Sequence, residues 1–199
     1  VYFTLRTNRK ALPFVAEHVR TTDPKVTLRS GKLMARAFAA SFEGKEREAV
    51  ARSFTTATIA TYWNKIQEGA AHRFRLPAFF AVQSTVELPD TALTLAKTMG
   101  EAACELDPLA ASYLISVTYT AMLPDEMRSR LGAYYTPPPL AERLVAMATS
   151  AGVNWKTCRV LDPACGGGAF LSAVAAPIVN AAGYAPAAKT IAGIASRLK

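Results

Sequence analysis

A glycine-rich segment near the end of the chain carries the clearest chemical signal in the sequence. It starts at Asp162, runs to three consecutive glycines ending at Gly168, and is followed by an apolar stretch at 169–182. Because glycine has no Cβ, a ligand can approach the backbone closely, and a following helix N-terminus directs amide groups at it. The segment therefore predicts a ligand-binding turn, with a purely structural turn as the alternative.

Two common ligands of glycine-rich turns do not fit this sequence. A phosphate-binding P-loop needs lysine followed by serine or threonine after its glycines, whereas Ala169 and Phe170 follow here. The dinucleotide fingerprint needs glycine at the position of Leu171. The turn is therefore expected to bind neither a nucleotide triphosphate nor a dinucleotide in these established ways.

A second motif lies one expected helix upstream, where Tyr134 and Tyr135 precede Thr136 and Pro137. Together with the segment 162–171, it resembles the amino (N6-adenine) DNA methyltransferases. The resemblance is to the group whose cofactor region precedes the catalytic region, as in type I modification subunits and fused restriction-modification enzymes. That family typically shows D-P-A-C-G-S-G-A-F-L, from which this chain departs only at its second glycine, and the match is specific over about 131–171.

The resemblance implies S-adenosyl-L-methionine as the cofactor. In the family, the turn would wrap the methionine portion, Asp162 would act on the ammonium directly or through water, and Thr136 would bind the carboxylate. The implied cofactor-binding residues are Tyr135, Thr136, Pro137, Asp162, Pro163, Ala164, Cys165, Gly166 and Gly168. Simple core packing is the alternative role for either Tyr134 or Tyr135.

No catalytic residue of such an enzyme is found in the sequence. The family uses an Asn/Asp-Pro-Pro-aromatic motif on the flipped adenine. The nearest matches, the prolines after Thr136 and the dipeptide at Asp107, lack its essential residues. Since the chain begins at Val1 and ends at Lys199 within an apparently incomplete α/β unit, we expect an N-terminal fragment that is inactive alone.

The spacing of apolar residues predicts the elements that position these motifs. Helices are expected at 31–42, 54–66, 89–106, 108–122, 140–152 and 169–182, and short strands at 2–5 and 158–162. Strand, glycine-rich turn and helix in that order begin a doubly wound α/β sheet. We therefore expect a mainly α-helical N-terminal domain at 1–130, followed at 131–199 by the truncated start of a Rossmann-like α/β class I methyltransferase domain.

The basic charge of the chain is concentrated in its first part. Residues 1–75 hold 14 lysines and arginines against 6 acidic residues, whereas residues 76–199 hold 9 of each. A basic surface favours approach to a phosphate backbone. Charge alone leaves contact with a nucleic acid open, since many soluble basic domains never bind one. The resemblance to the DNA methyltransferases implies duplex DNA as a partner, with a specificity or nuclease subunit as a further one.

Cysteine usage and hydropathy limit the remaining classes. Three dispersed cysteines and two histidines (Cys104, Cys158, Cys165, His18 and His72) predict neither a disulfide framework nor a metal site. No apolar run reaches the ~18–20 residues of a membrane-spanning helix, and the N-terminus has no signal-peptide pattern. A cytoplasmic protein without membrane contact is expected, and the family resemblance implies a bacterial or archaeal one.

These observations lead to one main hypothesis and two alternatives. The main hypothesis is a site-specific methyltransferase that acts on N6 of adenine in duplex DNA, within a restriction-modification or phage-defence system. The first alternative is methylation of RNA or protein, because related enzymes share the glycine turn. The second is a non-enzymatic helical interaction domain that ends in a vestigial cofactor fold.

Overall fold

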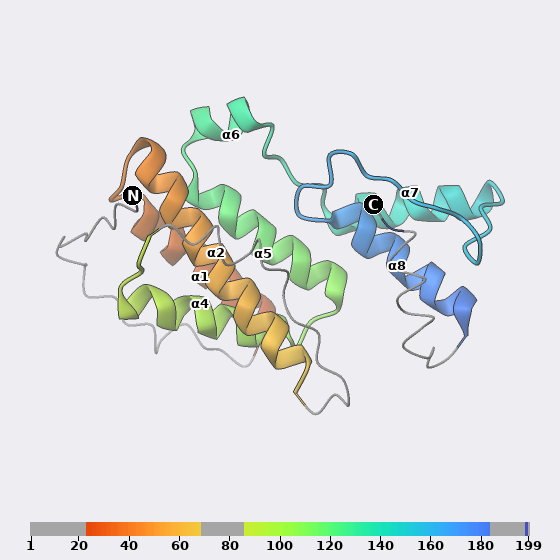
Figure 1. The fold of residues 1–199 in the computed structure, drawn as a ribbon, viewed down its shortest axis with the longest axis horizontal. Helices are drawn as coiled ribbons and strands as arrows, with labels where there is room; N and C mark the ends of the chain where they lie inside the picture. The colour runs from red at the N-terminus through yellow and green to blue at the C-terminus, as the bar shows by residue number, and fades with distance from the viewer. Residues whose placement is uncertain (1–22, 69–85, 184–197, 199) are drawn as a thin grey trace, which may run out of the picture. The chain divides into compact units, whose positions relative to one another are not determined.

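The computed structural model describes residues 23–68, 86–183 and 198, and these residues form seven helices (Figure 1). The helices are α1 (Pro24–Ala39), α2 (Gly44–Ile66), α4 (Asp90–Ala103), α5 (Pro108–Met122), α6 (Asp125–Leu131), α7 (Pro138–Ser150) and α8 (Ala169–Ala182). The chain divides into two compact units: the first comprises Val1–Asp107 and Leu114–Tyr134, and the second comprises Pro108–Tyr113 and Tyr135–Lys199. Helix α5 therefore contributes residues to both.

Local sequence signals account for how the helices of the first unit begin and end. The side chain of Asp23 caps α1 by accepting a 2.8 Å hydrogen bond from the amide of Lys25, and Pro24 occupies the first turn. Helix α6 starts after Pro124 with two acidic residues and ends at Gly132, whose φ of +59° is left-handed. These are standard signals for starting and stopping a helix.

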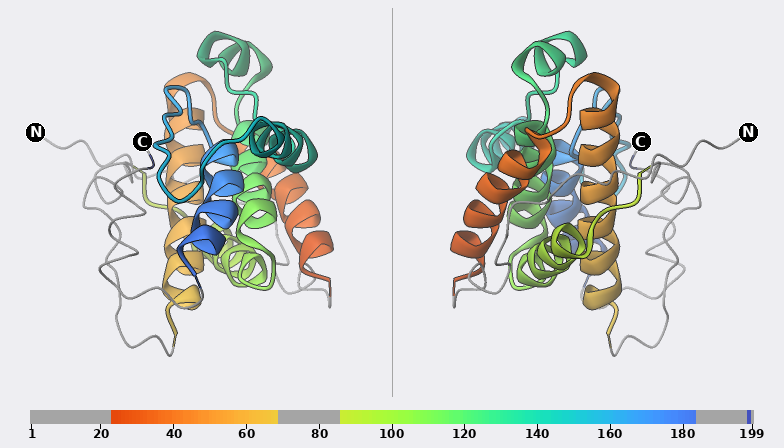
Figure 2. Two further views of the ribbon diagram at one scale, coloured as in Figure 1. Left: turned by 90° about the vertical axis from the view of Figure 1, so that its right-hand side faces the viewer. Right: turned by 90° about the vertical axis from the view of Figure 1, so that its left-hand side faces the viewer.

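The core of the first unit forms where α4 packs against α1 and α2 (Figure 1 and Figure 2). Its largest side chains with almost no exposure include Leu28, Phe54, Leu95 and Met99. Gly100 allows α4 to approach α2 closely, because a Cβ there would lie 2.6 Å from the backbone oxygen of Thr58. Small residues at the crossing thus determine how tightly these helices pack.

The second unit is built on the contact between α7 and α8. Leu109, Ala141 and Ala173 form one buried cluster, against which Val145 and Phe170 pack. Val174 and Ile178 form a second, covered by partly buried residues that include Trp155 and Val160. Both clusters line the inner face of α8, so this helix is the centre of the unit.

The expected Rossmann-like α/β domain at 131–199 is wrong. The described residues of this region form helices α7 and α8 and contain no strand, and the segment expected as a strand makes one isolated parallel bridge, from Val160 to Leu198. A strand is stable only where neighbouring strands pair its backbone groups along their length. Leu161, which should be buried within a parallel sheet, is instead 72% exposed.

The individual helices expected from apolar spacing are present, although their boundaries differ. Helix α8 has the expected bounds, whereas α1 begins seven residues earlier than 31, and α6 was not expected. The expected strand at 2–5 lies outside the described residues. In the described ranges, no helix combines the length and apolar character that crossing a membrane requires.

Candidate functional site

The ring of Tyr135 lies directly against Gly166. Gly166 has a φ of +50°, and a Cβ on it would lie 2.8 Å from Cε1 and 3.1 Å from Cδ1 of Tyr135. Carbon atoms do not approach this closely, and left-handed backbone is itself unfavourable for other residues. The structure thus brings Tyr135 of the upstream motif next to Gly166 of the glycine-rich segment, at a position that only glycine fits.

The turn after Asp162 is held by its own short hydrogen bonds. Oδ1 of Asp162 accepts a 3.2 Å hydrogen bond from the amide of Ala164, and the amide of Gly168 donates to the carbonyl of Cys165 at 2.6 Å. Asp162 is half-buried, and its other carboxylate oxygen accepts no hydrogen bond from the described residues. The turn is therefore closed on itself while one carboxylate oxygen remains available to a ligand.

Helix α8 begins at the end of this turn. Gly168 is its N-cap with a φ of +76°, and the amide of Ser172 donates the first helical hydrogen bond, 2.8 Å long, to the Gly168 carbonyl. The amides at 169–171 precede that bond and have no acceptor within the helix. Within the described chain, the amides of Gly166 and Gly167 also donate no hydrogen bond. Several donors next to a helix N-terminus favour an anionic group.

The remaining expected cofactor-binding residues lie on the same two segments. Thr136 is half-buried and Pro137 is exposed at the N-cap of α7, while Pro163, Ala164 and Cys165 are exposed on the turn. The Thr136 hydroxyl makes no hydrogen bond with other described residues. It is therefore available as a donor or acceptor, as expected for a residue that binds a ligand.

An apolar groove of about 450 Å³ borders the same turn. Its walls come from α7, α8 and the segment between them, and they include Val145, Trp155, Leu161, Asp162 and Phe170. The indole Nε1 of Trp155 donates a 3.0 Å hydrogen bond to the hydroxyl of Thr149, which fixes the ring. Sites for small organic ligands are typically grooves of this size with mostly apolar walls and a few polar groups.

Two further aromatic residues of the motifs, Tyr134 and Phe170, differ in their packing. Tyr134 is 67% exposed, and its hydroxyl lies 3.0 Å from the hydroxyl of Ser129, so it does not pack in a core. Phe170 packs against the helical cluster that contains Leu109 and Ala141. Sequence patterns did not identify Trp155 as part of a groove, because the groove forms only where α7, α8 and the segment between them pack together.

Neither a metal-binding cluster in the described chain nor a similar known protein indicates what this site binds. The described residues contain no group of three or more histidine, cysteine, aspartate or glutamate side chains able to hold a metal ion. Comparison of the chain with protein-family models, curated proteins and solved structures gives no match.

Proposed function

We propose that the second unit binds S-adenosyl-L-methionine as part of an N6-adenine DNA methyltransferase. The observation that carries the proposal is the contact between Tyr135 and Gly166, which joins two motifs that resemble that family and lie far apart in the sequence. The proposal depends on these two segments and not on a sheet.

The residues present match the chemistry of this cofactor. S-adenosylmethionine has a carboxylate, an ammonium and a sulfonium at one end and an adenosine at the other, and when bound it supplies an electrophilic methyl group. The amides of Gly166 and Gly167 suit the carboxylate. The available oxygen of Asp162 suits the ammonium, and the groove lined by Trp155 and Phe170 supplies an apolar wall.

Tryptophan fluorescence tests this proposal. In a Trp63→Phe background, the emission of Trp155 reports on the groove alone, since the chain has two tryptophans. Addition of S-adenosylmethionine should change the emission along a saturable curve. The variant Asp162→Asn should weaken binding by about 10-fold or more, because a charge-assisted hydrogen bond contributes ~1.5–3 kcal/mol.

The matched control is Asn154→Ala. Asn154 is exposed in the same unit and lies outside the groove, where its side chain accepts a 3.0 Å hydrogen bond from the amide of Lys156. This variant should bind the cofactor as the parent does. Equal weakening by both variants would argue against a specific role for Asp162.

The proposed methyl acceptor is duplex DNA, and measuring duplex binding tests this part of the proposal. RNA and protein methyltransferases share glycine-rich cofactor turns, so the turn alone does not select DNA. The concentration of basic residues in 1–75 favours a nucleic acid. A specificity or nuclease subunit remains a proposed partner on the resemblance alone.

A second candidate function is a non-enzymatic helical interaction domain with a vestigial cofactor site. It is favoured by the helical character of the described residues, with a single isolated bridge between Val160 and Leu198. Calorimetric titration separates the two candidates. If the chain is only an interaction domain, S-adenosylmethionine should give no binding heat even at about 1 mM. Titration to this concentration detects a binding free energy of only about −4 kcal/mol.

A further inference from the structure

The first unit contains a cleft whose walls are strongly basic. It has a volume of about 630 Å³ and is formed by parts of α1, α2, α5 and α6. Four of its lining residues are cationic and one is acidic: Lys32, Arg36, Arg47, Arg128 and Asp125. Nothing in the cofactor site involves these side chains, since they belong to a different compact unit.

The positive charge of the cleft is not neutralised by its surroundings. Asp125 forms an ion pair with Arg128, and in the described part of the chain Lys32 and Arg36 have no ion-pair partner. Burial, followed by repulsion from Arg36, lowers the pKa of Arg47 below its ordinary value. Cations that are held near one another without enough carboxylates gain stability when an anion binds between them.

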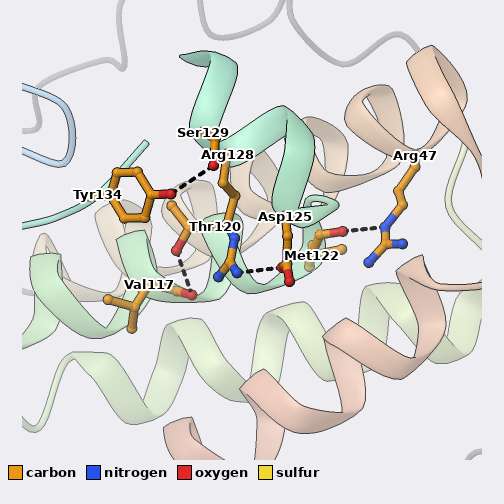
Figure 3. Close-up of polar contacts among 8 residues, drawn as sticks. All are labelled: Arg47, Val117, Thr120, Met122, Asp125, Arg128, Ser129 and Tyr134. Carbon is orange, nitrogen blue, oxygen red and sulfur yellow. Dashed lines mark hydrogen bonds and ion pairs between the residues drawn. The ribbon is translucent and has the colours of Figure 1, made fainter. Parts of the chain in front are cut away.

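Hydrogen bonds fix two of the guanidinium groups in place. Nε of Arg47 donates a 2.6 Å hydrogen bond to the carbonyl of Met122, which joins the start of α2 to the end of α5. Arg128, on α6, is held by its ion pair with Asp125. Figure 3 shows Met122 between the side chains of Arg47 and Arg128. No described residue accepts a hydrogen bond from the buried Nε–H of Arg128, so Asp125 does not satisfy that guanidinium completely. Arginines that are already ordered lose less entropy when they bind a phosphate.

We propose that this cleft binds a phosphate group, and that the phosphate is carried by the backbone of duplex DNA. Lys32 and Arg36, one turn apart on α1, add positive charge to the wall of the cleft, while Arg47 and Arg128 add guanidinium donors that are held in place. The phosphate site itself follows from the cleft. The choice of DNA over other carriers rests on the proposed function.

A charge-matched pair of double variants tests the site without cofactor. Lys32→Gln with Arg36→Gln removes two charges from the cleft, and Lys97→Gln with Arg130→Gln removes two exposed charges outside it. Binding of a fluorescently labelled duplex of about 20 base pairs is measured by anisotropy over about 50–200 mM salt. The cleft pair should weaken binding about 10-fold at low salt and reduce the salt slope by about one to two, whereas the control pair should change affinity less than about two-fold.

Two further measurements identify the source of the phosphate and check that the variants are folded. Inorganic pyrophosphate is titrated into the parent protein and the cleft pair by calorimetry, and both variants are checked for an unchanged thermal melting curve. Pyrophosphate binding that needs Lys32 and Arg36, without duplex binding that needs them, would support the phosphate site but overturn DNA as its source. Preference for an RNA duplex through these two side chains would also overturn DNA.

The phosphate site itself is overturned under either of two results. In the first, both double variants weaken duplex binding equally, which would show a response to total charge alone. In the second, neither duplex nor pyrophosphate binding depends on the cleft pair. Because no cofactor is present in these measurements, failure here is separate from failure of the proposed cofactor site.

Discussion

Tyr135 covers Gly166 so closely that a Cβ on the glycine would lie 2.8 Å from Cε1 of the ring. The two residues are 31 positions apart in sequence, Tyr135 before α7 and Gly166 after it. Their contact is the structural basis for treating the two motifs as one site, because local turn geometry alone would not require an aromatic ring there.

This contact predicts a specific pattern of stability. Gly166→Ala should destabilise the second unit by about 2–3 kcal/mol, of which ~1–2 kcal/mol comes from the left-handed backbone and the rest from the clash with the ring. Addition of Tyr135→Ala should recover the clash portion, so the double variant is more stable than the sum of the single changes predicts.

Urea denaturation, followed through Trp155 in the Trp63→Phe background, measures this coupling. Gly152→Ala is the matched control, because Gly152 has a φ of +88° and nothing within 4 Å of a Cβ. It should lose only the backbone portion and show no coupling to Tyr135→Ala. Strict additivity of the Gly166 and Tyr135 changes would mean that the two residues do not touch.

Two glycines in the first unit should respond differently to alanine. A Cβ on Gly100 would lie 2.6 Å from the Thr58 carbonyl oxygen, whereas a Cβ on Gly31 would lie 2.6 Å from Sδ of Met99. A backbone carbonyl cannot move away without separating α4 from α2, but a methionine side chain adjusts easily.

Gly100→Ala should therefore lower the free energy of unfolding by about 1–3 kcal/mol. Gly31→Ala should stay within about 1 kcal/mol of the parent, because the helix propensity of alanine offsets the local adjustment. Chemical denaturation monitored by circular dichroism gives both values. A larger loss for Gly31→Ala than for Gly100→Ala would contradict the described packing of α4 on α2.

Stability should also fall at alkaline pH because of Cys104. Burial raises the pKa of this thiol above its ordinary value of 9.0, and its Sγ lies 3.2 Å from the Gly100 carbonyl oxygen. The unfolded chain then loses the thiol proton at lower pH than the folded chain does, so the unfolded state binds fewer protons above about pH 9. The stabilising contribution is complete below that pH and is lost as the pH rises through the folded pKa.

Melting temperatures measured from pH 7 to about pH 11 test this expectation. Cys104→Ala should flatten the decline above about pH 9, whereas Cys165→Ala, at an exposed position, should leave its shape unchanged. Burial also raises the pKa of Tyr62 and Tyr119, which should produce a further decline above about pH 10 in every variant. An identical slope in the parent and Cys104→Ala would show that the thiol does not contribute.

Local sequence patterns predicted the helices because each pattern is contained within its own helix. The apolar stretch between Gly168 and Gly183 defines α8 completely, and both glycines have positive φ. Helix α6 was missed although Pro124 and Gly132 mark its ends, because its seven residues are too short to show apolar periodicity. The start of α1 was also missed, although Asp23 and Pro24 mark it, because the prediction from apolar spacing began at 31.

The strand and the groove could not be predicted in the same way. The run from Cys158 to Asp162 was predicted as a strand, but strand formation depends on partners elsewhere in the chain. The contact of Tyr135 with Gly166 and the grouping of Arg47 with Arg128 likewise depend on tertiary packing. Motifs located the candidate site residues, whereas their mutual contacts required the structure.

Calorimetric titration of S-adenosylmethionine into the chain and its Gly166→Ala and Gly152→Ala variants tests the central claim most directly. The parent and Gly152→Ala should each bind one equivalent with similar affinity, and Gly166→Ala should bind at least about 10-fold more weakly, a difference of about 1.4 kcal/mol. Absence of binding to the parent at about 1 mM cofactor, or equal affinity in all three proteins, would contradict the assignment of this turn.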